Sequence, residues 1–394
     1  MVSRLPLSAP DLPDFPGDMA KYGYDVTVFE ALHEIGGVLK YGIPEFRLPN
    51  KVVDVEIENL AKMGVNFIKD CIIGKTISVE QLEEEGFKGV FVASGAGLPN
   101  FMNIPGENSI NILSSNEYLT RVNLMDAASE DSDTPVPFGK NVAVIGGGNV
   151  SMDAVRTAKR LGAKKVSIVY RRRVADMTAL PAEIEAAVAE GVELLTLVAP
   201  AGIEVDENGH VSGVRVTPQM ISTIKDGRAS VTASGEPDYV IPCQTMIVAI
   251  GQNIETKHYE ESGIPVSRGK IVTLPNGGFA DIPGVFAGGD CASGPATVIK
   301  AVAAAKVTAA NIDEYLGFHH QITSDVEIPY AGYEDKEPCG RVEVALRDAA
   351  DRKKDFEPIE YGFSCEEACQ ESGRCLRCDH FGFGSFRGGR EEKW

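Results

Sequence analysis

Short apolar runs alternate along the chain with longer segments whose apolar residues recur every three or four positions. The runs have the length of buried strands, and they lie at 26–29, 65–68, 89–94, 142–145, 166–170, 192–198 and 245–250. The longer segments have the spacing of amphipathic helices, and they lie at 52–63, 149–161, 181–190 and 296–316. This alternation predicts a doubly wound α/β fold with parallel sheets.

Three parts of the chain depart from that pattern. Residues 1–18 are rich in proline and have no apolar periodicity, so we expect an irregular segment there. The polar stretch 126–138 is typical of a linker. Apolar and polar residues alternate in 211–217 and 229–234, and the turn-forming run 225–228 between them predicts a β-hairpin.

The clearest motif is a glycine turn between two apolar runs. The run 142–145 leads into Gly146, Gly147 and Gly148, then a helical segment and a second run. This order places a pyrophosphate at a helix N-terminus, because Gly146 permits a tight turn, Gly148 lets the backbone approach the phosphates, and Ser151 allows close packing of helix and strand. The plain alternative is a glycine turn in an ordinary α/β domain beside a solvated basic run.

The residues that end the second run indicate which dinucleotide is bound. An acidic residue at this position would bond the 2′-hydroxyl of an adenosine ribose. The chain instead has Arg171, Arg172 and Arg173, and guanidinium groups bind a 2′-phosphate through charge-assisted hydrogen bonds. We therefore expect NADP(H) in preference to NAD(H).

Composition narrows the classes of partner. The chain has 394 residues, enough for more than one domain, and a formal net charge of -19, which argues against a nucleic-acid partner. No apolar stretch is long enough to span a bilayer, and no charged-then-apolar signal sequence opens the chain. We expect a cytoplasmic protein that makes no membrane contact.

Two segments far apart in the chain suggest a second dinucleotide site. Glu30 ends an apolar run, where an acidic residue would bond an adenosine ribose. Gly289 and Asp290 follow another apolar run, and the first turn of the next helix, at 296–298, would direct its N–H groups and positive dipole at a flavin. The NADP-type unit between these segments would then be an insertion in a flavin domain.

The sequence resembles the small (beta) subunits of glutamate synthase and their relatives, which are FAD- and NADPH-dependent oxidoreductases with two Rossmann-like domains. The matching motifs stand in the family's order, and they are GGVLKYGIPEFRLP (36–49), VIGGGNVSMDA (144–154), YRRR (170–173), ALPAEIEAAVAEGVE (179–193), AIGQ (249–252), and GVFAGGD followed by ATVIKAVAAAK (284–306).

The resemblance implies a division of the chain and two sets of site residues. An FAD domain would span 19–125 and 252–318, an NADP domain at 139–251 would be inserted in it, and a cysteine-rich tail would occupy 319–394. The residues implied for FAD are Glu30, Gly36, Gly37, Leu39, Gly95, Gly289, Asp290, Thr297 and Val298. Those implied for NADP(H) are Gly147, Gly148, Asn149, Val150, Arg171, Arg172 and Gly251.

One part of the family pattern is missing from the chain. In the family a strand and a GxGxxG turn precede the helix that ends in AKYGYDVTVFE, whereas residues 1–18 contain only Gly17 and no apolar strand. That loop would hold the FAD pyrophosphate, so its loss would remove several backbone N–H donors. Either a shifted reading frame or genuine divergence would account for this segment.

A group of cysteines near the C-terminus suggests a metal site. Cys365, Cys369, Cys375 and Cys378 place four thiols in a short stretch, which suits a 4Fe–4S cluster or a tetrahedral zinc ion. An iron–sulfur cluster is favoured because the expected chemistry is electron transfer. Zinc and unliganded thiols are the alternatives.

Together these features predict an oxidoreductase that passes electrons from NADPH through FAD to an iron–sulfur centre, and then to a redox partner subunit or carrier. Glutamate synthesis itself would need a separate large chain. One alternative is an NADP-binding scaffold or inactive subunit that has lost FAD. Another is a disulfide reductase, although residues 31–70 contain no cysteine to face a flavin.

Overall fold

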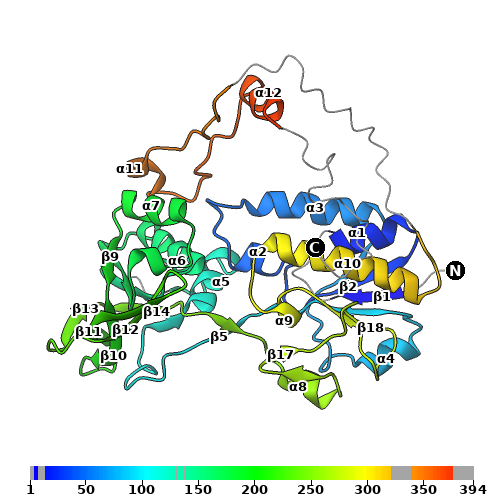
Figure 1. The fold of residues 1–394 in the computed structure, drawn as a ribbon, viewed down its shortest axis with the longest axis horizontal. Coiled ribbons are helices and arrows are strands. Elements are labelled where there is room, and N and C mark those ends of the chain that lie inside the picture. The colour runs from blue at the N-terminus through cyan, green and yellow to red at the C-terminus, as the bar shows by residue number, and fades with distance from the viewer. Residues whose placement is uncertain (1–3, 8–13, 130, 137–138, 321–338, 376–394) are drawn as a thin grey trace.

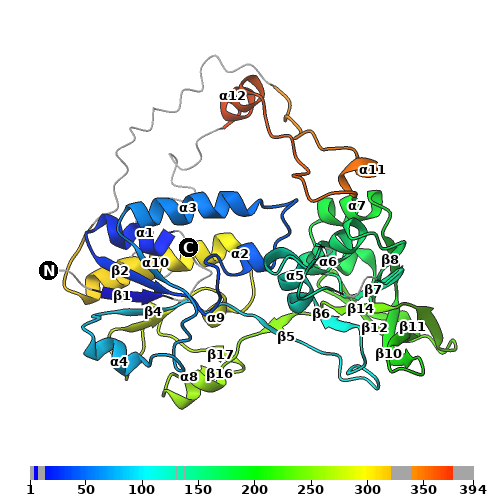
Figure 2. The same cartoon turned by 180° about the vertical axis from the view of Figure 1, so that it is seen from behind.

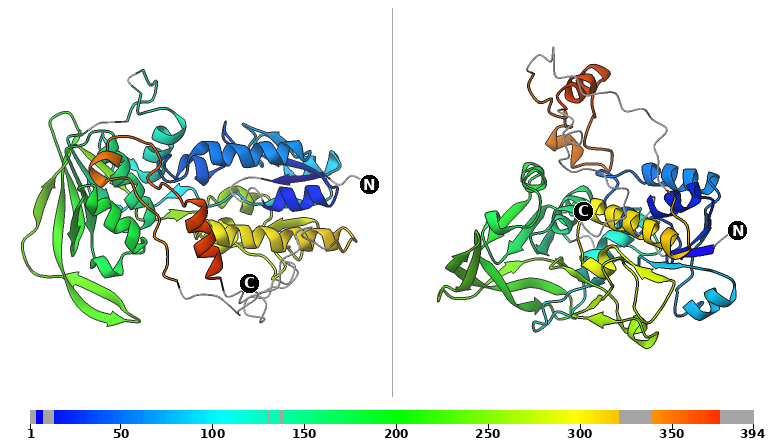
Figure 3. Two further views of the ribbon diagram at one scale, coloured as in Figure 1. Left: turned by 90° about the horizontal axis from the view of Figure 1, so that it is seen from above. Right: turned by 45° about the vertical axis from the view of Figure 1, so that its right-hand side comes forward.

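The computed structural model describes residues 4–7, 14–129, 131–136, 139–320 and 339–375. Two α/β halves lie side by side along the long axis of the molecule, and the short strand β5 runs between them (Figures 1 and 2). The view from above shows the same two halves end to end (Figure 3). Among the described residues, no helix has both the length and the apolar character needed to cross a bilayer.

The first half is built on a parallel five-stranded sheet in the order β18-β4-β1-β2-β3. Its strands are β1 (Arg4–Leu7), β2 (Asp25–Phe29), β3 (Asn66–Ile68), β4 (Val90–Val92) and β18 (Val285–Ala287). Its main helices are α1 (Asp14–Lys21), α3 (Asn50–Lys62), α4 (Val79–Glu84) and α10 (Val298–Tyr315). Phe15 of α1, Phe91 of β4 and Ala309 of α10 belong to one buried cluster, so segments from both ends of the chain share a core.

The expectation of an irregular segment over residues 1–18 is wrong for two stretches. Residues 4–7 form strand β1 in the middle of the sheet, and helix α1 already begins at Asp14. Leu7 pairs with Val28 on one side and with Phe91 on the other. The strand was not expected because it is short and contains Pro6, which has no N–H group to donate to a neighbouring strand. It forms because the backbone groups of β2 and β4 need hydrogen-bond partners on either side of it.

The second half is built on another parallel sheet, in the order β6-β14-β7-β8-β9. Its strands are β6 (Ile112–Ser114), β7 (Asn141–Ile145), β8 (Lys165–Tyr170), β9 (Glu193–Thr196) and β14 (Thr245–Val248). Its helices are α5 (Ser115–Leu124), α6 (Asn149–Arg160) and α7 (Pro181–Ala189), with the short 3-10 turn η1 (Val174–Asp176) after β8.

A smaller antiparallel sheet packs beside the second half. It contains β10 (Val198–Val205), β11 (Val211–Lys225), β12 (Arg228–Ala233) and β13 (Tyr239–Pro242). The predicted hairpin is confirmed, since Lys225 pairs with Arg228 across a two-residue turn. Asp226 and Gly227 both have positive φ, at 50° and 78°, as a type I′ turn requires.

The remaining elements connect the two halves and form the C-terminal segment. Strand β5 (Leu98–Pro99) pairs with β15 (Gln252–Asn253) where the chain enters and leaves the second half. Short elements of the first half are α2 (Val38–Tyr41), α8 (Lys257–Glu261), β16 (Val266–Ser267), β17 (Lys270–Ile271) and α9 (Asp290–Ser293). The C-terminal segment holds α11 (Ala349–Arg352), which lies over α7, and α12 (Cys365–Gly373) (Figure 1).

Candidate functional site

The turn between β7 and α6 begins with positions where only glycine fits. Gly146 has a φ of 145°, and a Cβ added there would lie 2.2 Å from the carbonyl oxygen of Ala249. A Cβ on Gly147 would lie 2.7 Å from the ring of Tyr170. The backbone therefore comes close to its neighbours, and helix α6 starts directly after Gly148 with no side-chain cap over its first N–H groups.

A cavity of about 510 Å³ opens above this turn. Gly146, Gly147 and Gly148 form one part of its wall, and Arg171 and Arg172, at the end of β8, form another. Several elements contribute apolar residues to the wall, and these include Phe101, Met102 and Ile104 from the segment before β6 and Ala249 and Ile250 just after β14. A glycine turn at a helix N-terminus that faces two cations could hold an anion, and the apolar wall beside it could cover the rest of a ligand.

The other residues predicted for this site support the turn. Asn149 accepts a hydrogen bond at Oδ1 from the backbone N–H of Leu180 (2.9 Å), and buried Ser151 donates from Oγ to the carbonyl of Ala249 (3.4 Å). Val150 packs against the core of this half, and Gly251 has a φ of 119° just after the cavity wall. These residues shape the site, while the two arginines and the glycines face the open space.

The arginines after β8 do not act as a set of three. Arg173 donates from Nε (2.8 Å) and Nη2 (2.9 Å) to the two carboxylate oxygens of buried Asp176, and this pairing holds the pKa of Asp176 well below its usual range. Arg172 differs, because its buried Nε has no hydrogen-bond partner among the described residues. Arg171 and Arg172 are therefore available to bind a ligand, whereas the guanidinium group of Arg173 is held by Asp176.

Glu30 lies at the carboxyl end of β2 and is 5% exposed. Its Oε1 accepts a hydrogen bond from the backbone N–H of Leu32 (2.9 Å), whereas its buried Oε2 has no partner among the described residues. Burial raises the pKa of Glu30 to about 7, against the lowering effect of the backbone hydrogen bonds. A buried acceptor with no protein donor fits a ligand hydroxyl.

The side chain of Tyr41 is affected by the charges of both Glu30 and Asp290. Burial, and then the negative charges of Glu30 and Asp290, raise the pKa of Tyr41 to about 12. Both carboxylates therefore lie close enough to Tyr41 to act on it, although they come from different parts of the chain. Asp290 accepts a hydrogen bond from the backbone N–H of Ala296 (3.1 Å), which holds the chain just before helix α10.

The other residues predicted for the first half follow the same edge of its sheet. Gly95 comes after β4 and has a φ of 68°, and Gly289 comes after β18 and has a φ of 69°. Thr297 is the N-cap of α10 and Val298 is 44% exposed at its first turn. Carboxyl ends of parallel strands meet at one edge of a sheet, where open α/β sheets bind ligands.

A glycine loop beside α2 belongs to the same half. Gly36 and Gly37 have φ values of 131° and 50°, and Gly37 is the N-cap of the helical turn that contains Leu39. A Cβ on Gly36 would lie 3.0 Å from the side chain of Lys40, so the loop approaches its neighbours closely. The segment between β1 and α1, residues 8–13, lies outside the described residues, and its sequence SAPDLP contains no glycine.

The two halves contact each other through residues that sequence reasoning did not select. Arg47, on the loop before α3, donates from Nη1 to both carboxylate oxygens of Asp153 on α6, at 2.7 and 2.9 Å. Its neighbour Phe46 is 1% exposed. The guanidinium carbon of Arg160 on α6 lies 3.7 Å from the centroid of the Phe46 ring. Both belong to the GIPEFRLP motif, so the motif itself was the available signal.

The cysteine cluster is only partly within the described residues. Cys365 and Cys369 lie on α12 and Cys375 follows it, all three exposed, while Cys378 lies outside the described residues. Within the described part of the chain, no group of three or more histidines, cysteines or carboxylates could hold a metal ion. Exposed Cys339 was not selected, yet Gln370 of α12 donates to the carbonyl of the adjacent Gly340 (3.0 Å).

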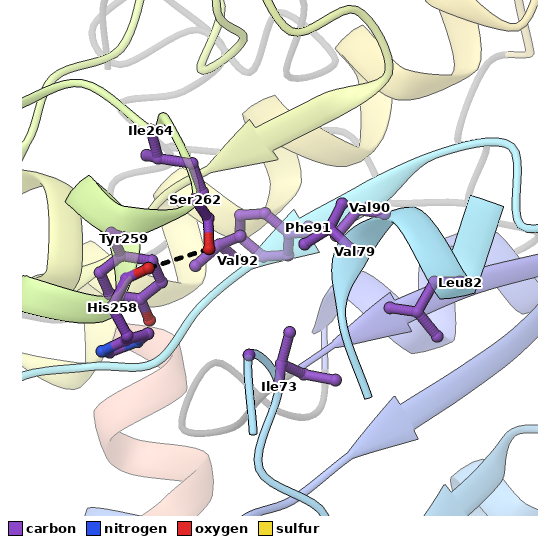
Figure 4. Close-up of a pocket in the computed structure, with 11 residues that line it drawn as sticks. Ile73, Val79, Leu82, Val90, Phe91, Val92, His258, Tyr259, Ser262 and Ile264 are labelled. Carbon is purple, nitrogen blue, oxygen red and sulfur yellow. Dashed lines mark hydrogen bonds between the residues drawn. The ribbon is translucent and has the colours of Figure 1, made fainter. Parts of the chain in front are cut away.

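A second pocket lies beneath strand β4 and is too small for a substrate. It holds about 40 Å³ and is lined mostly by apolar side chains such as Leu82, Phe91 and Ile264 (Figure 4). Ser262 donates from Oγ to the carbonyl of His258 (2.9 Å), which satisfies the hydroxyl without a ligand. This pocket has room for about one or two water molecules.

Comparison with known proteins agrees with this geometry. The family model described as pyridine nucleotide-disulphide oxidoreductase matches residues 17–305. The beta subunit of the NADP(+)-dependent formate dehydrogenase of Moorella thermoacetica is 35% identical over 381 residues, covering 92% of this chain and 52% of that protein. The putative NADPH glutamate synthase small chain of Cereibacter sphaeroides is 32% identical over 324 residues, covering 76% of this chain and 75% of that one.

Solved structures show the same fold at lower sequence identity. FprA of Mycobacterium tuberculosis, in complex with NADPH, superposes with a TM-score of 0.67 at 17% identity, covering 80% of this chain and 85% of that chain. The expected resemblance to glutamate synthase small subunits and the expected pair of Rossmann-like domains are thereby confirmed. The chain spans about half the length of the formate dehydrogenase subunit, at 52%.

Proposed function

Because the chain belongs to the pyridine nucleotide-disulphide oxidoreductase family, we propose that it transfers electrons from NADPH through FAD to a partner subunit or electron carrier. Membership of the family makes it an NAD(P)H-dependent oxidoreductase. The proposal adds the phosphorylated dinucleotide, the flavin of this particular chain and the destination of the electrons.

The observation that carries the proposal is the cavity of about 510 Å³ between the glycine turn and the end of β8. The turn at Gly146 and the N-terminus of α6 would hold the pyrophosphate of the nicotinamide dinucleotide. Arg171 and Arg172 would bind its 2′-phosphate, and the unpartnered Nε of Arg172 supports this role. The apolar wall, with Met102 and Ile250, would exclude water from the rest of the ligand.

The residues of the first half fit the flavin dinucleotide. Glu30 offers a buried, unpaired carboxylate oxygen to a ribose hydroxyl, and the exposed first turn of α10 at Thr297 and Val298 offers N–H groups to the flavin ring. Gly95 and Gly289 keep the ends of β4 and β18 free of side chains, and Gly36 does the same for the loop before α2. When bound, FAD accepts two electrons together and releases them singly.

The C-terminal cysteines support an iron–sulfur centre, and the name of a relative supports a partner subunit. Cys365, Cys369 and Cys375 are exposed near one another in the chain, and with Cys378 they would supply four thiolates to an iron–sulfur cluster. The Moorella relative is named as a beta subunit, which supports a partner chain here. A zinc ion or unliganded thiols are distinguished from a cluster by metal analysis. The cytoplasmic location stays a prediction.

The buried cysteines of the described residues do not favour direct reduction of a disulfide. Cys71, Cys243 and Cys291 are buried and unbridged, and burial raises the pKa of Cys243 to about 12. A thiol that resists ionisation is a poor nucleophile. A second candidate, an NADP-binding scaffold that has lost FAD, is supported by the absence of glycine from residues 8–13.

The absorption spectrum of the purified full chain, before and after incubation with FAD and desalting, tests the proposal. We expect bands at about 375 and 450 nm that stay with the protein, as for a bound flavin. A Glu30→Gln variant should retain less flavin, because its amide replaces the carboxylate that would bond the ribose. A chain that binds NADPH but retains no FAD would establish the scaffold instead.

A further inference from the structure

A third cation reaches the NADP(H) cavity from a different element. Arg228, the first residue of β12, lines the cavity together with Arg171 and Arg172. Within the part of the chain that the structure describes, none of these three guanidinium groups forms an ion pair with a carboxylate. Three uncompensated positive charges around one cavity are notable in a chain whose net charge is -19.

The tip of the β11–β12 hairpin is held in place by the turn after β8. Asp176 accepts a hydrogen bond at Oδ1 from the backbone N–H of Ala229 (2.9 Å), and Arg173 donates from Nη2 to the carbonyl of Gly227 (3.2 Å). These bonds flank Arg228 on both sides. Asp176 is 6% exposed and Ala229 is 2% exposed, so the anchor is a buried one beneath the exposed Arg228.

We propose that Arg228 completes the site for the 2′-phosphate. Arg171 and Arg172, which follow β8, would supply two of its cations, and Arg228 of the β11–β12 hairpin would supply the third. This inference rests on the proposed function. Arg173 is then a positioning residue together with Asp176, since its charge is used to hold the hairpin and not the ligand. A phosphate that carries up to two negative charges is matched better by three converging guanidinium groups than by two.

The test compares two small ligands that differ only in the 2′-phosphate. Adenosine 2′,5′-bisphosphate and adenosine 5′-monophosphate are titrated into the full chain by calorimetry at one fixed salt concentration. Arg228→Ala should weaken binding of the bisphosphate by about tenfold, the loss expected for one charge-assisted contact, while binding of the monophosphate changes by less than about twofold. Lys225→Ala is the matched control, because it removes the same charge from the same hairpin at a residue outside the cavity wall.

The outcomes separate this inference from the function on which it rests. If the unaltered chain binds neither ligand, the proposed function fails. If it prefers the bisphosphate but Arg228→Ala changes nothing, or weakens both ligands equally, or matches Lys225→Ala, only the inference fails.

The role of Asp176 is tested by non-additivity. Asp176→Asn should reduce the preference for the bisphosphate in the presence of Arg228, because the hairpin tip loses a charged anchor. It should have little further effect in the Arg228→Ala background. A loss of equal size in both backgrounds would mean that Asp176 acts only on the general fold.

Discussion

At the scale of single residues, the buried carboxylate of Glu30 lowers the stability of the unliganded protein, and the proposed ligand would offset that cost. Its carboxylate is buried, one oxygen has no partner among the described residues, and its pKa is raised to about 7. The cost of burying that group is recovered when a ligand hydroxyl donates to it. Fold stability and ligand binding therefore make opposite demands at this position.

This conflict predicts a distinctive dependence of stability on pH. The carboxyl of Glu30 has its ordinary pKa of 4.5 in the unfolded chain and a pKa of about 7 in the folded one, so folding favours the protonated form. The stabilisation is fully present at pH values below the pKa of Glu30 in the unfolded chain. It is lost as the pH rises through the pKa in the folded chain, and the free energy of unfolding falls by about 3 kcal/mol in total. Urea unfolding of flavin-free protein at pH 5 and pH 8 measures it.

Glu30→Gln should abolish this component of the pH dependence. Glu56→Gln, at an exposed position on α3, is the control and should leave it unchanged. An equal fall in stability between the two pH values for the unaltered chain and the Glu30 variant would show that the carboxyl is not the responsible group.

Single residues can be selected from the sequence where the chemistry is local. Arg171 and Arg172 follow directly from the strand that precedes them, and the structure places both in the cavity wall. Arg228 was not selected, because its hairpin reaches the cavity only through tertiary packing. Arg173 was grouped with its neighbours because sequence cannot show that Asp176 already binds it.

At the scale of elements, the C-terminal segment is anchored to the second half by a buried cluster of charges. Glu190, at the end of α7, is fully buried and accepts hydrogen bonds from Arg156 (2.9 Å), Arg160 (2.7 Å) and Arg352 (2.8 Å). Arg352 is the last residue of α11 and is 4% exposed. The side chain of Arg352 therefore reaches a buried carboxylate inside the second half.

Removing that anchor should loosen the segment. Arg352→Ala takes away one charge-assisted hydrogen bond to a buried carboxylate, so we expect a loss of about 1.5–3 kcal/mol from the attachment and faster proteolysis within 339–375. Arg341→Ala, which breaks an exposed pair with Glu343 (3.6 Å), should change neither quantity measurably. Equal cleavage of the two variants in limited proteolysis would contradict the anchoring role.

Predictions of elements succeeded where the segment has a clear apolar pattern and failed where it has none. The hairpin was found because its alternation and turn residues agree, and the helix at α6 because its small residues follow a glycine turn. Strand β1 was missed because Arg4–Leu7 contains Pro6 and has no continuous apolar run, although it lies at the centre of the first sheet. Pairing with β2 and β4 makes residues 4–7 a strand.

At the scale of the whole molecule, an α/β unit is inserted between parts of another, and the two are joined by a specific contact. The first sheet takes strands from residues 4–92 and again from 285–287, while the second takes its strands from 112–248. Arg47 crosses between them to Asp153 and to Glu183, where its Nε lies 3.2 Å from Oε1. Transfer between two bound dinucleotides requires such a fixed relation between domains.

The sequence predicted this arrangement of domains but not the contact that fixes it. The glycine turn and Glu30 are each readable from adjacent residues. The pairing of Arg47 with Asp153 is not, because it joins positions 106 residues apart.

We propose that NADPH bound in the cavity beside Gly146 reduces a flavin held beside Glu30. The most direct test of this proposal is anaerobic mixing of the FAD-loaded chain with NADPH or NADH while the absorbance at about 450 nm is followed. We predict that NADPH bleaches this band at far lower concentration than NADH. In the Arg171→Ala, Arg172→Ala double variant the NADPH requirement should rise by about 100-fold, two phosphate contacts of about 1.5 kcal/mol each, with NADH unaffected. A flavin band that persists in excess NADPH, or an equal loss for both dinucleotides in the double variant, would contradict the account.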